Sequence, residues 1–240
     1  MYYKYSSFLS QFSGDMVKEN SSCNNKAAVI VETRCSVWAP LVIKNFISVL
    51  DDSWNLRIFG GQTFINYIVK CLPGIKLEIV NIGIDHLNIK NYNKLLCSDN
   101  FWNIIPEEHI LIFQLDTLLI KNIPNNILNY DYIGATCGNK VTSETFIING
   151  GLSLRKKSKM LKVLELYDNT DYINEDTFYT SSLRKIKNSN LPKFEICNTY
   201  FGESIILSSD QLVGLHGTDK FYNQNNILIE NVLSNYTSKP

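Results

Sequence analysis

Gln114 and Asp116 are the first residues in this sequence whose type and spacing could do chemistry. They end a strongly apolar stretch, HILIFQLD, and because they are two residues apart they would point to the same side of a strand. A carboxylate at such a strand end can hold a divalent cation, which in turn neutralises a diphosphate. The alternative is that Asp116 only caps the turn into the next residues. By themselves the two residues leave both interpretations open.

A second candidate is the run Asn149-Gly150-Gly151, which removes two side chains from the strand-like stretch TFIINGGLSLR. Adjacent glycines weaken a strand unless some group must approach the backbone closely. A bulge or tight bend is the alternative, and it is favoured when the glycines are considered alone. The residues that follow, LSL, exclude the nucleophile elbow of hydrolases.

Glu175 and Asp176 could supply a general base, and His216 could supply a metal ligand. The two acids follow Asn174, a good N-cap, and acids in a first helical turn suit the helix dipole, so a structural role is favoured for them alone. His216 ends a predicted strand, but a lone histidine is more often an ordinary packed residue. No zinc spacing occurs in the sequence.

The segments that must position these residues alternate between strands and helices. Buried strands are predicted at 26–33, 55–61, 75–82 and 109–116, and helices between them at 39–54, from a cap at Thr63 to residue 72, and at 91–106. This order predicts a doubly wound α/β domain with a mostly parallel sheet. Ligands of such sheets lie beyond the carboxyl ends of the strands, and that is where Asp116 falls.

Beyond Asp116 the pattern predicts strands at 130–135, 145–155 and 212–217, a helix at 156–168 and another from about Asn174. No repeat or linker indicates a second domain. We therefore expect one domain at 27–217. A polar arm outside the core, 1–26, would precede it, and a polar tail with a short amphipathic helix, 218–240, would follow.

Composition excludes several classes of protein. The 240 residues carry 23 basic and 23 acidic side chains, and this balance argues against a broad nucleic-acid-binding face. No apolar run is long enough to span a membrane, and the first residues lack the apolar core of a signal peptide. We expect a soluble, cytoplasmic protein, whose six scattered cysteines are free thiols, several of them in the core.

From about Ala27 to Gly217 the chain resembles glycosyltransferases of the GT-A fold. It is most similar to a family of uncharacterised GT-A-like proteins known from giant viruses, algae, fungi and bacteria. The stretches NFISVLDDSWNLRIFGG, FWNIIPEEHILIFQLDTLL, NGGLSLR, NEDTFY and GLHG carry the resemblance. GT-A enzymes share a DxD metal motif, a glycine-rich loop, an x-E-D motif and a C-terminal histidine in fixed order. Here that order is kept by Gln114-Leu115-Asp116, Asn149-Gly150-Gly151, Asn174-Glu175-Asp176 and His216.

The resemblance implies a single-domain enzyme that moves a sugar from a nucleotide-sugar donor, most simply a UDP-sugar, to a glycan or protein acceptor. Asp116 and His216 would coordinate Mn²⁺ or Mg²⁺, and an imidazole ligand favours Mn²⁺. Gln114 stands where most relatives have an acid, and its amide could still bind ribose or a metal-bound water. A viral source would place the protein in the host cytoplasm or the virion.

Other positions receive roles from the same resemblance. Glu32, Thr33 and Arg34 would lie near the base and ribose, at the end of the first strand. Gly150 and Gly151 would let backbone amides lie against the donor sugar or the acceptor. Asp176, with Glu175 as the neighbouring candidate, would deprotonate the acceptor hydroxyl and invert the anomeric carbon.

Two other functions remain open at this point. A sugar nucleotidyltransferase also grips a nucleotide with a metal, but it would normally carry a glycine-rich basic loop after its first strand, and VETRCSVWAP has no glycine. A catalytically silent protein that binds a sugar or a nucleotide could have kept the fold.

Overall fold

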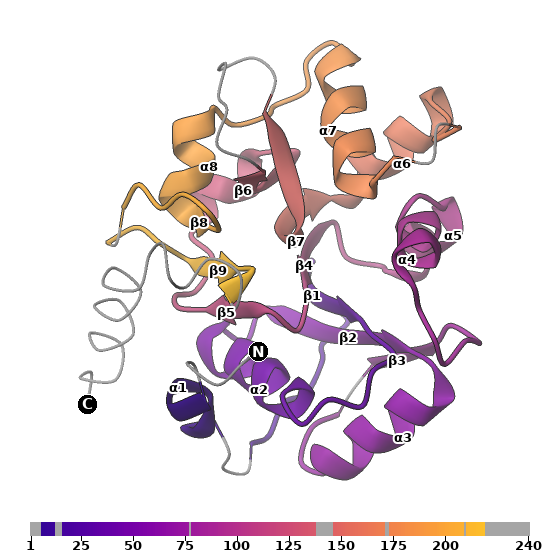
Figure 1. The fold of residues 1–240 in the computed structure, drawn as a ribbon, viewed down its shortest axis with the longest axis vertical. Coiled ribbons are helices and arrows are strands. Elements are labelled where there is room, and N and C mark those ends of the chain that lie inside the picture. Colours follow the sequence, from indigo (N-terminus) through magenta and orange to yellow (C-terminus); the bar gives the residue numbers. More distant parts are fainter. Residues whose placement is uncertain are drawn as a thin grey trace.

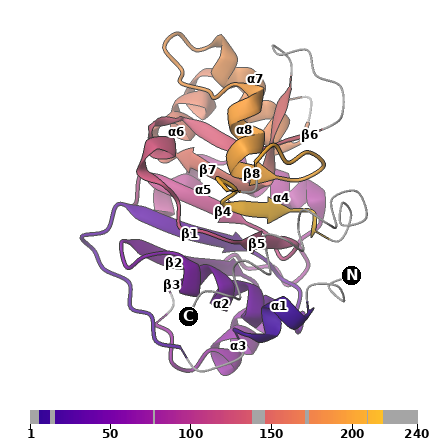
Figure 2. The same cartoon turned by 90° about the vertical axis from the view of Figure 1, so that its left-hand side faces the viewer.

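A six-stranded sheet forms the centre of the protein. The computed structural model describes residues 6–12, 16–76, 78–137, 146–170, 173–208 and 210–218. The sheet order is β3-β2-β1-β4-β7-β6, and Figure 2 shows the strands rising from β3 to β7. Its strands are β1 (Lys26–Val31), β2 (Trp54–Gly60), β3 (Glu78–Asn81), β4 (His109–Phe113), β6 (Tyr132–Cys137) and β7 (Ile147–Lys156). The first four run parallel, whereas β7 is antiparallel to both of its neighbours, β4 and β6. The predicted doubly wound, mostly parallel sheet is confirmed.

A second, small sheet lies beside the large one (Figure 1). It has the order β5-β9-β8, from β5 (Thr117–Leu119), β9 (Gly214–His216) and β8 (Phe201–Gly202). The side chain of Asn45 anchors β5, because its amide donates to the Leu119 carbonyl and accepts from the Leu119 N–H. Strands of two or three residues are too short to show a period of two, so the sequence pattern predicted only β9.

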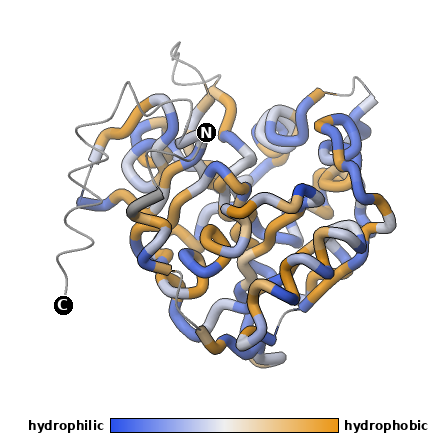
Figure 3. Tube along the Cα trace, turned by 60° about the horizontal axis from the view of Figure 1, so that its bottom comes forward, coloured by the Kyte–Doolittle hydropathy of each residue, from blue (hydrophilic) through white to orange (hydrophobic). Residues whose placement is uncertain are grey.

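Helices surround both sheets. They are α1 (Ser6–Ser10), α2 (Ala39–Val49), α3 (Gln62–Cys71), α4 (Ile89–Leu96), α5 (Asp99–Ile104), α6 (Lys157–Leu166), α7 (Glu175–Lys185) and α8 (Phe194–Tyr200), with a 3₁₀ turn, η2 (Asn125–Asn129). Most helical turns carry both hydrophobic and hydrophilic residues, as is typical of helices that cover a core (Figure 3). No helix in the described ranges is long and apolar enough to cross a membrane.

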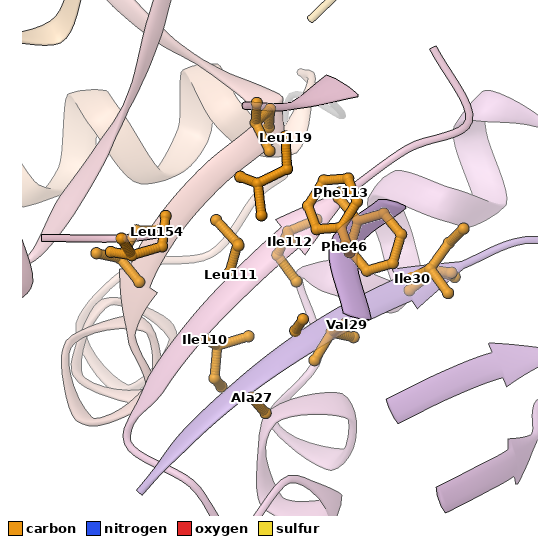
Figure 4. Packing of buried hydrophobic residues seen from close by; sticks show 14 of the residues in the cluster. Ala27, Val29, Ile30, Phe46, Ile110, Leu111, Ile112, Phe113, Leu119 and Leu154 are labelled. Carbon is orange, nitrogen blue, oxygen red and sulfur yellow. The ribbon is translucent and has the colours of Figure 1, made fainter. Parts of the chain in front are cut away.

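The core lies where β1 and β4 pair in the middle of the large sheet. Every residue of β1 after Lys26 is buried, which explains its continuous apolar run. Figure 4 shows this packing from close by, and there Phe46 of α2 stacks on Phe113 at the end of β4, with ring centroids 3.9 Å apart. The carboxyl end of β4 is therefore fixed by packing on both faces of the sheet.

The boundaries of three predicted helices were wrong. The helix predicted at 91–106 is two helices, because Cys97 ends α4 and the Ser98 side chain caps α5 by accepting from Phe101 N–H. The helix predicted at 39–54 ends at Val49, since Trp54 already begins β2. Gly61, and not Thr63, is the N-cap of α3.

The predicted polar arm outside the core was wrong for the first of its described residues, while most of residues 16–25 are exposed or half-buried. Phe8, Leu9 and Phe12 are buried in the core cluster, because their spacing places them on one side of α1 and the turn after it. The backbone of Lys18 forms an isolated β-bridge with that of Ile75. At the other end Thr218 is buried, while the rest of the predicted tail, with its amphipathic helix, lies outside the described residues. The six cysteines are free thiols, as predicted, but only Cys197 is buried, so the expectation that several lie in the core was wrong.

Candidate active site

The turn after β4 is held by groups other than the Asp116 carboxylate. Thr117 Oγ1 donates to the Gln114 carbonyl at 2.6 Å, and the Thr218 N–H donates to the Asp116 carbonyl at 3.2 Å. Leu115 is buried between them. The turn is therefore held by other groups, and the Asp116 carboxylate makes no capping hydrogen bond to it within the described ranges. The contacts of the described residues therefore do not support the alternative in which Asp116 caps this turn.

His216 reaches Asp116 through the register of the small sheet. Because His216 is paired with Thr117, its ring comes beside the preceding residue, and Nε2 lies 3.6 Å from Asp116 Oδ1. Its other nitrogen, Nδ1, lies 3.1 Å from Glu203 Oε1, and both side chains are buried. A carboxylate on Nδ1 favours the tautomer with its proton on that nitrogen, which directs the Nε2 lone pair to the Asp116 side.

This pair of atoms fits a shared divalent cation. Two ligand atoms that each lie about 2.1 Å from one ion are roughly 3–4 Å apart, and the separation of Nε2 and Oδ1 is in that range. The described residues contain no group of three or more His, Cys, Asp or Glu that could hold a metal. An ion bound here would thus depend on water or phosphate oxygens for its other ligands, as Mg²⁺ in nucleotide sites commonly does.

The two glycines of β7 make room for protein side chains. The register between β6 and β7 shifts in this region, as it does at a bulge or another irregularity. A Cβ on Gly151 would lie 2.1 Å from His216 Nε2, and a Cβ on Gly150 would lie 2.1 Å from Glu175 Oε1. The Gly151 N–H already donates to Asn149 Oδ1 at 2.7 Å. The expectation that glycine amides face a ligand therefore needs correction at Gly151, where the space belongs to His216.

Below Gly150 lies a buried ion pair that sequence reasoning did not predict. Arg155 donates from Nη1 to Glu175 Oε2 at 2.6 Å and from Nη2 to Glu175 Oε1 at 3.0 Å and the Gly150 carbonyl at 3.2 Å. The Tyr132 ring lies 4.6 Å from the guanidinium carbon. Burial lowers the pKa of Arg155, but the charge of Glu175 and its hydrogen bonds raise it more, so Arg155 stays charged.

Glu175 and Asp176 consequently differ in surroundings although they are neighbours. Burial raises the pKa of Glu175 and Arg155 opposes that rise, and the carboxylate is fully engaged by the guanidinium. Asp176 is half-buried, and its Oδ1 accepts from the Thr177 N–H at 2.6 Å. No described residue donates to Oδ2. Of the two predicted candidates, only Asp176 has a carboxylate oxygen left for a substrate. Asn174 is the N-cap residue of α7, but its side chain makes no capping bond.

The end of β1 lies next to the end of β4, because Ile30 is paired with Phe113. Here the buried Glu32 carboxylate accepts from the N–H groups of Thr33 and Arg34, both at 2.8 Å, and holds the exposed Arg34 guanidinium at 2.6 Å. The structure thus places the three residues predicted for base and ribose at the same edge as Gln114.

The side chains of Tyr92 and Cys137 also lie near the candidate site. Burial raises the pKa of the Tyr92 hydroxyl, and the charge of Glu175 adds to the rise while Gln114 opposes it, so Tyr92 lies near both. Burial raises the pKa of Cys137 to about 12, and the charges of Asp176 and Glu203 act in the same direction. Both side chains are therefore neutral at pH 7. Neither they nor Glu203 were predicted, because none stands in a recognisable spacing, whereas Arg155 ends the NGGLSLR stretch and could have been noticed as an arginine in a buried strand.

Comparison with solved structures identifies the class of fold. The structure is similar to the crystal structure of the apo-form glycosyltransferase GlyE of Streptococcus pneumoniae TIGR4, with a TM-score of 0.51 and 13% sequence identity. The match covers 90% of this chain and 64% of that one. At this identity the similarity establishes the fold, which is a glycosyltransferase-like α/β fold. No curated protein matches the sequence.

Sequence comparison then identifies the family. Residues 75–216, more than half of the chain, match the family described as protein of unknown function DUF5672. The chain belongs to this family. The matched range contains Gln114, Asp116, Asn149–Gly151, Glu175, Asp176 and His216.

Proposed function

We propose that this protein transfers a sugar from a nucleotide-sugar donor, most simply a UDP-sugar, to an acceptor hydroxyl, with inversion at the anomeric carbon. One observation carries the proposal: Asp116 and His216 lie 3.6 Å apart at the ligand edge of a glycosyltransferase-like sheet. The order of the four GT-A motifs, and the description of GlyE as a glycosyltransferase, support it.

Donor binding would use both parts of the sheet edge. Asp116 and His216 would hold Mn²⁺ or Mg²⁺, with Glu203 keeping the imidazole oriented. A bound divalent ion would absorb the charge that develops on the leaving diphosphate. Thr33 and Arg34, organised by Glu32, would contact the base and ribose from the end of β1, with Gln114 beside them.

Asp176 would act as the general base. Its Oδ2 would accept the proton of the acceptor hydroxyl while that oxygen bonds to the anomeric carbon, and the bond from this carbon to the diphosphate oxygen breaks with its electron pair on UDP. Attack from the face opposite UDP gives inversion. The Arg155–Glu175 pair contacts no reacting atom in this scheme, and its role is to hold the first turn of α7 against Gly150.

A screen of nucleotide sugars tests the proposal. We expect slow hydrolysis of one UDP-sugar in Mn²⁺, and UDP binding in a titration that weakens when Mn²⁺ is omitted. UDP binding without turnover of any donor would indicate a silent binding protein. Release of pyrophosphate from a nucleoside triphosphate and a sugar phosphate would indicate a nucleotidyltransferase, and either result would overturn the proposal.

A further inference from the structure

A cavity lies between α4 and the segment that leads to α7, apart from the residues proposed to bind the donor. Its volume is about 650 Å³, within the range of small-ligand sites. Its walls are polar side chains from these two parts of the chain, with two isoleucines. The lining residues are Ile89, Lys90, Asn93, Lys94, Cys97, Asp168, Asn169, Thr170, Ile173 and Asn174.

The cavity adjoins the start of α7, where Asp176 lies. Asn93 joins the two, since its Nδ2 donates to Asn174 Oδ1 at 3.2 Å and its Oδ1 accepts from the Glu175 N–H at 3.3 Å. Asn174 lines the cavity and precedes Asp176 by two residues. A molecule in the cavity could therefore present one end to the carboxylate of Asp176.

The walls carry the groups that recognise hydroxyls. Three asparagine amides and the Thr170 hydroxyl line the cavity. The oxygens of Asn93 and Asn174 already accept hydrogen bonds, which leaves the Asn174 amide nitrogen and the Thr170 hydroxyl as groups that can bind a hydroxyl of a ligand. Ile89 and Ile173 are exposed and supply apolar surface for the C–H faces of a sugar ring.

Charge on the walls is mixed. Among the described lining residues Lys90 and Lys94 are basic and Asp168 is acidic, so the walls carry a small net positive charge. Strongly acidic ligands would need a more basic wall, and an apolar peptide segment would need more than two isoleucines. Among the described lining residues, the amides, one hydroxyl and charges of both signs match a neutral polyhydroxylated molecule.

We propose that this cavity is the acceptor site and that it takes a short neutral oligosaccharide, whose terminal hydroxyl reaches Asp176. The inference rests on the proposed function for the identity of the reaction. It adds the substrate class: the acceptor is a glycan, not a protein side chain.

A matched pair of variants tests the cavity. Lys94→Trp places a large ring in the last turn of α4, where it fills part of the cavity, and Lys70→Trp makes the same change in the last turn of α3, an exposed position outside it. The probes are lactose, maltose and cellobiose, with an acidic hexapeptide as the other class. Binding is followed by ligand-observed NMR, and transfer and donor hydrolysis by product formation.

We expect at least one disaccharide to bind the wild-type protein, and Lys94→Trp to weaken its binding by about tenfold or more while Lys70→Trp does not. Donor hydrolysis without acceptor should continue in both variants, because neither lysine lies at the donor edge. Equal sugar affinity in all three proteins, or binding of the peptide alone, would overturn the inference and leave the proposed function standing. If no donor is hydrolysed, the proposed function fails. The sugar titration with Lys94→Trp would then still decide whether the cavity binds glycans.

Discussion

Single residues of this site are distinguished by their surroundings more than by their type. Glu175 and Asp176 have the same charge and share one helical turn, yet one is neutralised by Arg155 and the other retains a carboxylate oxygen for a substrate. His216 and His109 differ in a similar way. His216 lies between two carboxylates at one end of the sheet, whereas His109 begins β4 at the other end.

Asp176→Asn should separate binding from chemistry. The amide cannot take a proton as a base, so the rate of transfer should fall by about 10²–10⁴-fold. UDP affinity should not change, and neither should the melting temperature, since the amide oxygen can still accept from Thr177. Single-turnover transfer beside a UDP titration measures both. Surviving transfer, or retention of configuration in the product, would remove Asp176 from the role of base.

Glu175→Gln should act on stability instead. The variant leaves Arg155, which is fully buried, without its counter-charge, and breaking such a pair costs roughly 3–5 kcal/mol. For a chain of this size that lowers the melting temperature by roughly 6–20 °C. Thermal unfolding monitored by circular dichroism provides the measurement. A normal melting temperature with abolished transfer would instead make Glu175 the base.

His216→Ala should raise the Mn²⁺ concentration needed for half-maximal donor hydrolysis, because it would remove one of the two proposed metal ligands. His109→Ala is the matched control and should leave that concentration unchanged. Glu203→Ala should weaken metal affinity by about 10–100-fold, the usual effect of losing the partner of a ligating histidine. The Mn²⁺ dependence of hydrolysis is measured for all three. A shift in His109→Ala equal to that in His216→Ala would show that the effect is not local.

Elements divide into those that sequence patterns predict and those that only tertiary contacts define. The strands β1 and β4 are buried continuous apolar runs, and β2 is buried throughout although it carries Asn55 and Arg57, so the sequence pattern revealed all three. In contrast β5 and β8 are both stabilised by pairing with β9, and β5 is also held by the Asn45 side chain, which acts across a large sequence separation. The glycines of β7 are intermediate. The two adjacent glycines suggested that some group approaches the backbone of β7 closely, but not that this group is a side chain of the protein itself.

Replacing each of the two glycines by alanine should therefore change different properties of the protein. Neither has a positive φ, so lack of space is the cause in both. In Gly151→Ala the new methyl group displaces the His216 ring, which should raise the Mn²⁺ requirement. In Gly150→Ala it meets Glu175 and Arg155, which should cost stability, about 1–3 kcal/mol for overpacking. Melting temperature and Mn²⁺ titration on both variants test this, and matching profiles would contradict it.

For the molecule as a whole, the fold predicted from the sequence is confirmed, whereas the ligand edge stays a prediction and several residues of the candidate site were not predicted. Asp116 was found because the carboxyl end of a buried strand is a position defined by topology. Glu203 was not, since it follows β8 in an irregular segment and reaches His216 only through the small sheet. The same limit applies to Asn93, whose importance comes from α7 packing beside α4.

Because the proposed ligands come from segments distant in sequence, a bound ligand should stabilise the whole fold. Asp116 follows β4 and His216 ends β9, so an ion and UDP held between them would oppose separation of the two sheets. At a UDP concentration about 100 times its Kd, binding adds about 2.7 kcal/mol to the free energy of unfolding. The melting temperature should then rise by roughly 5–11 °C in Mn²⁺, and by much less after a chelator is added.

Asp116→Asn should keep the melting temperature of the free protein and lose the Mn²⁺-dependent part of the rise, because the amide keeps the shape of the side chain but not its charge. Differential scanning calorimetry of both proteins, with and without UDP and Mn²⁺, provides the test. An equal rise in wild type and variant would exclude Asp116 as a metal ligand, and an equal rise with and without Mn²⁺ would exclude a metal from nucleotide binding.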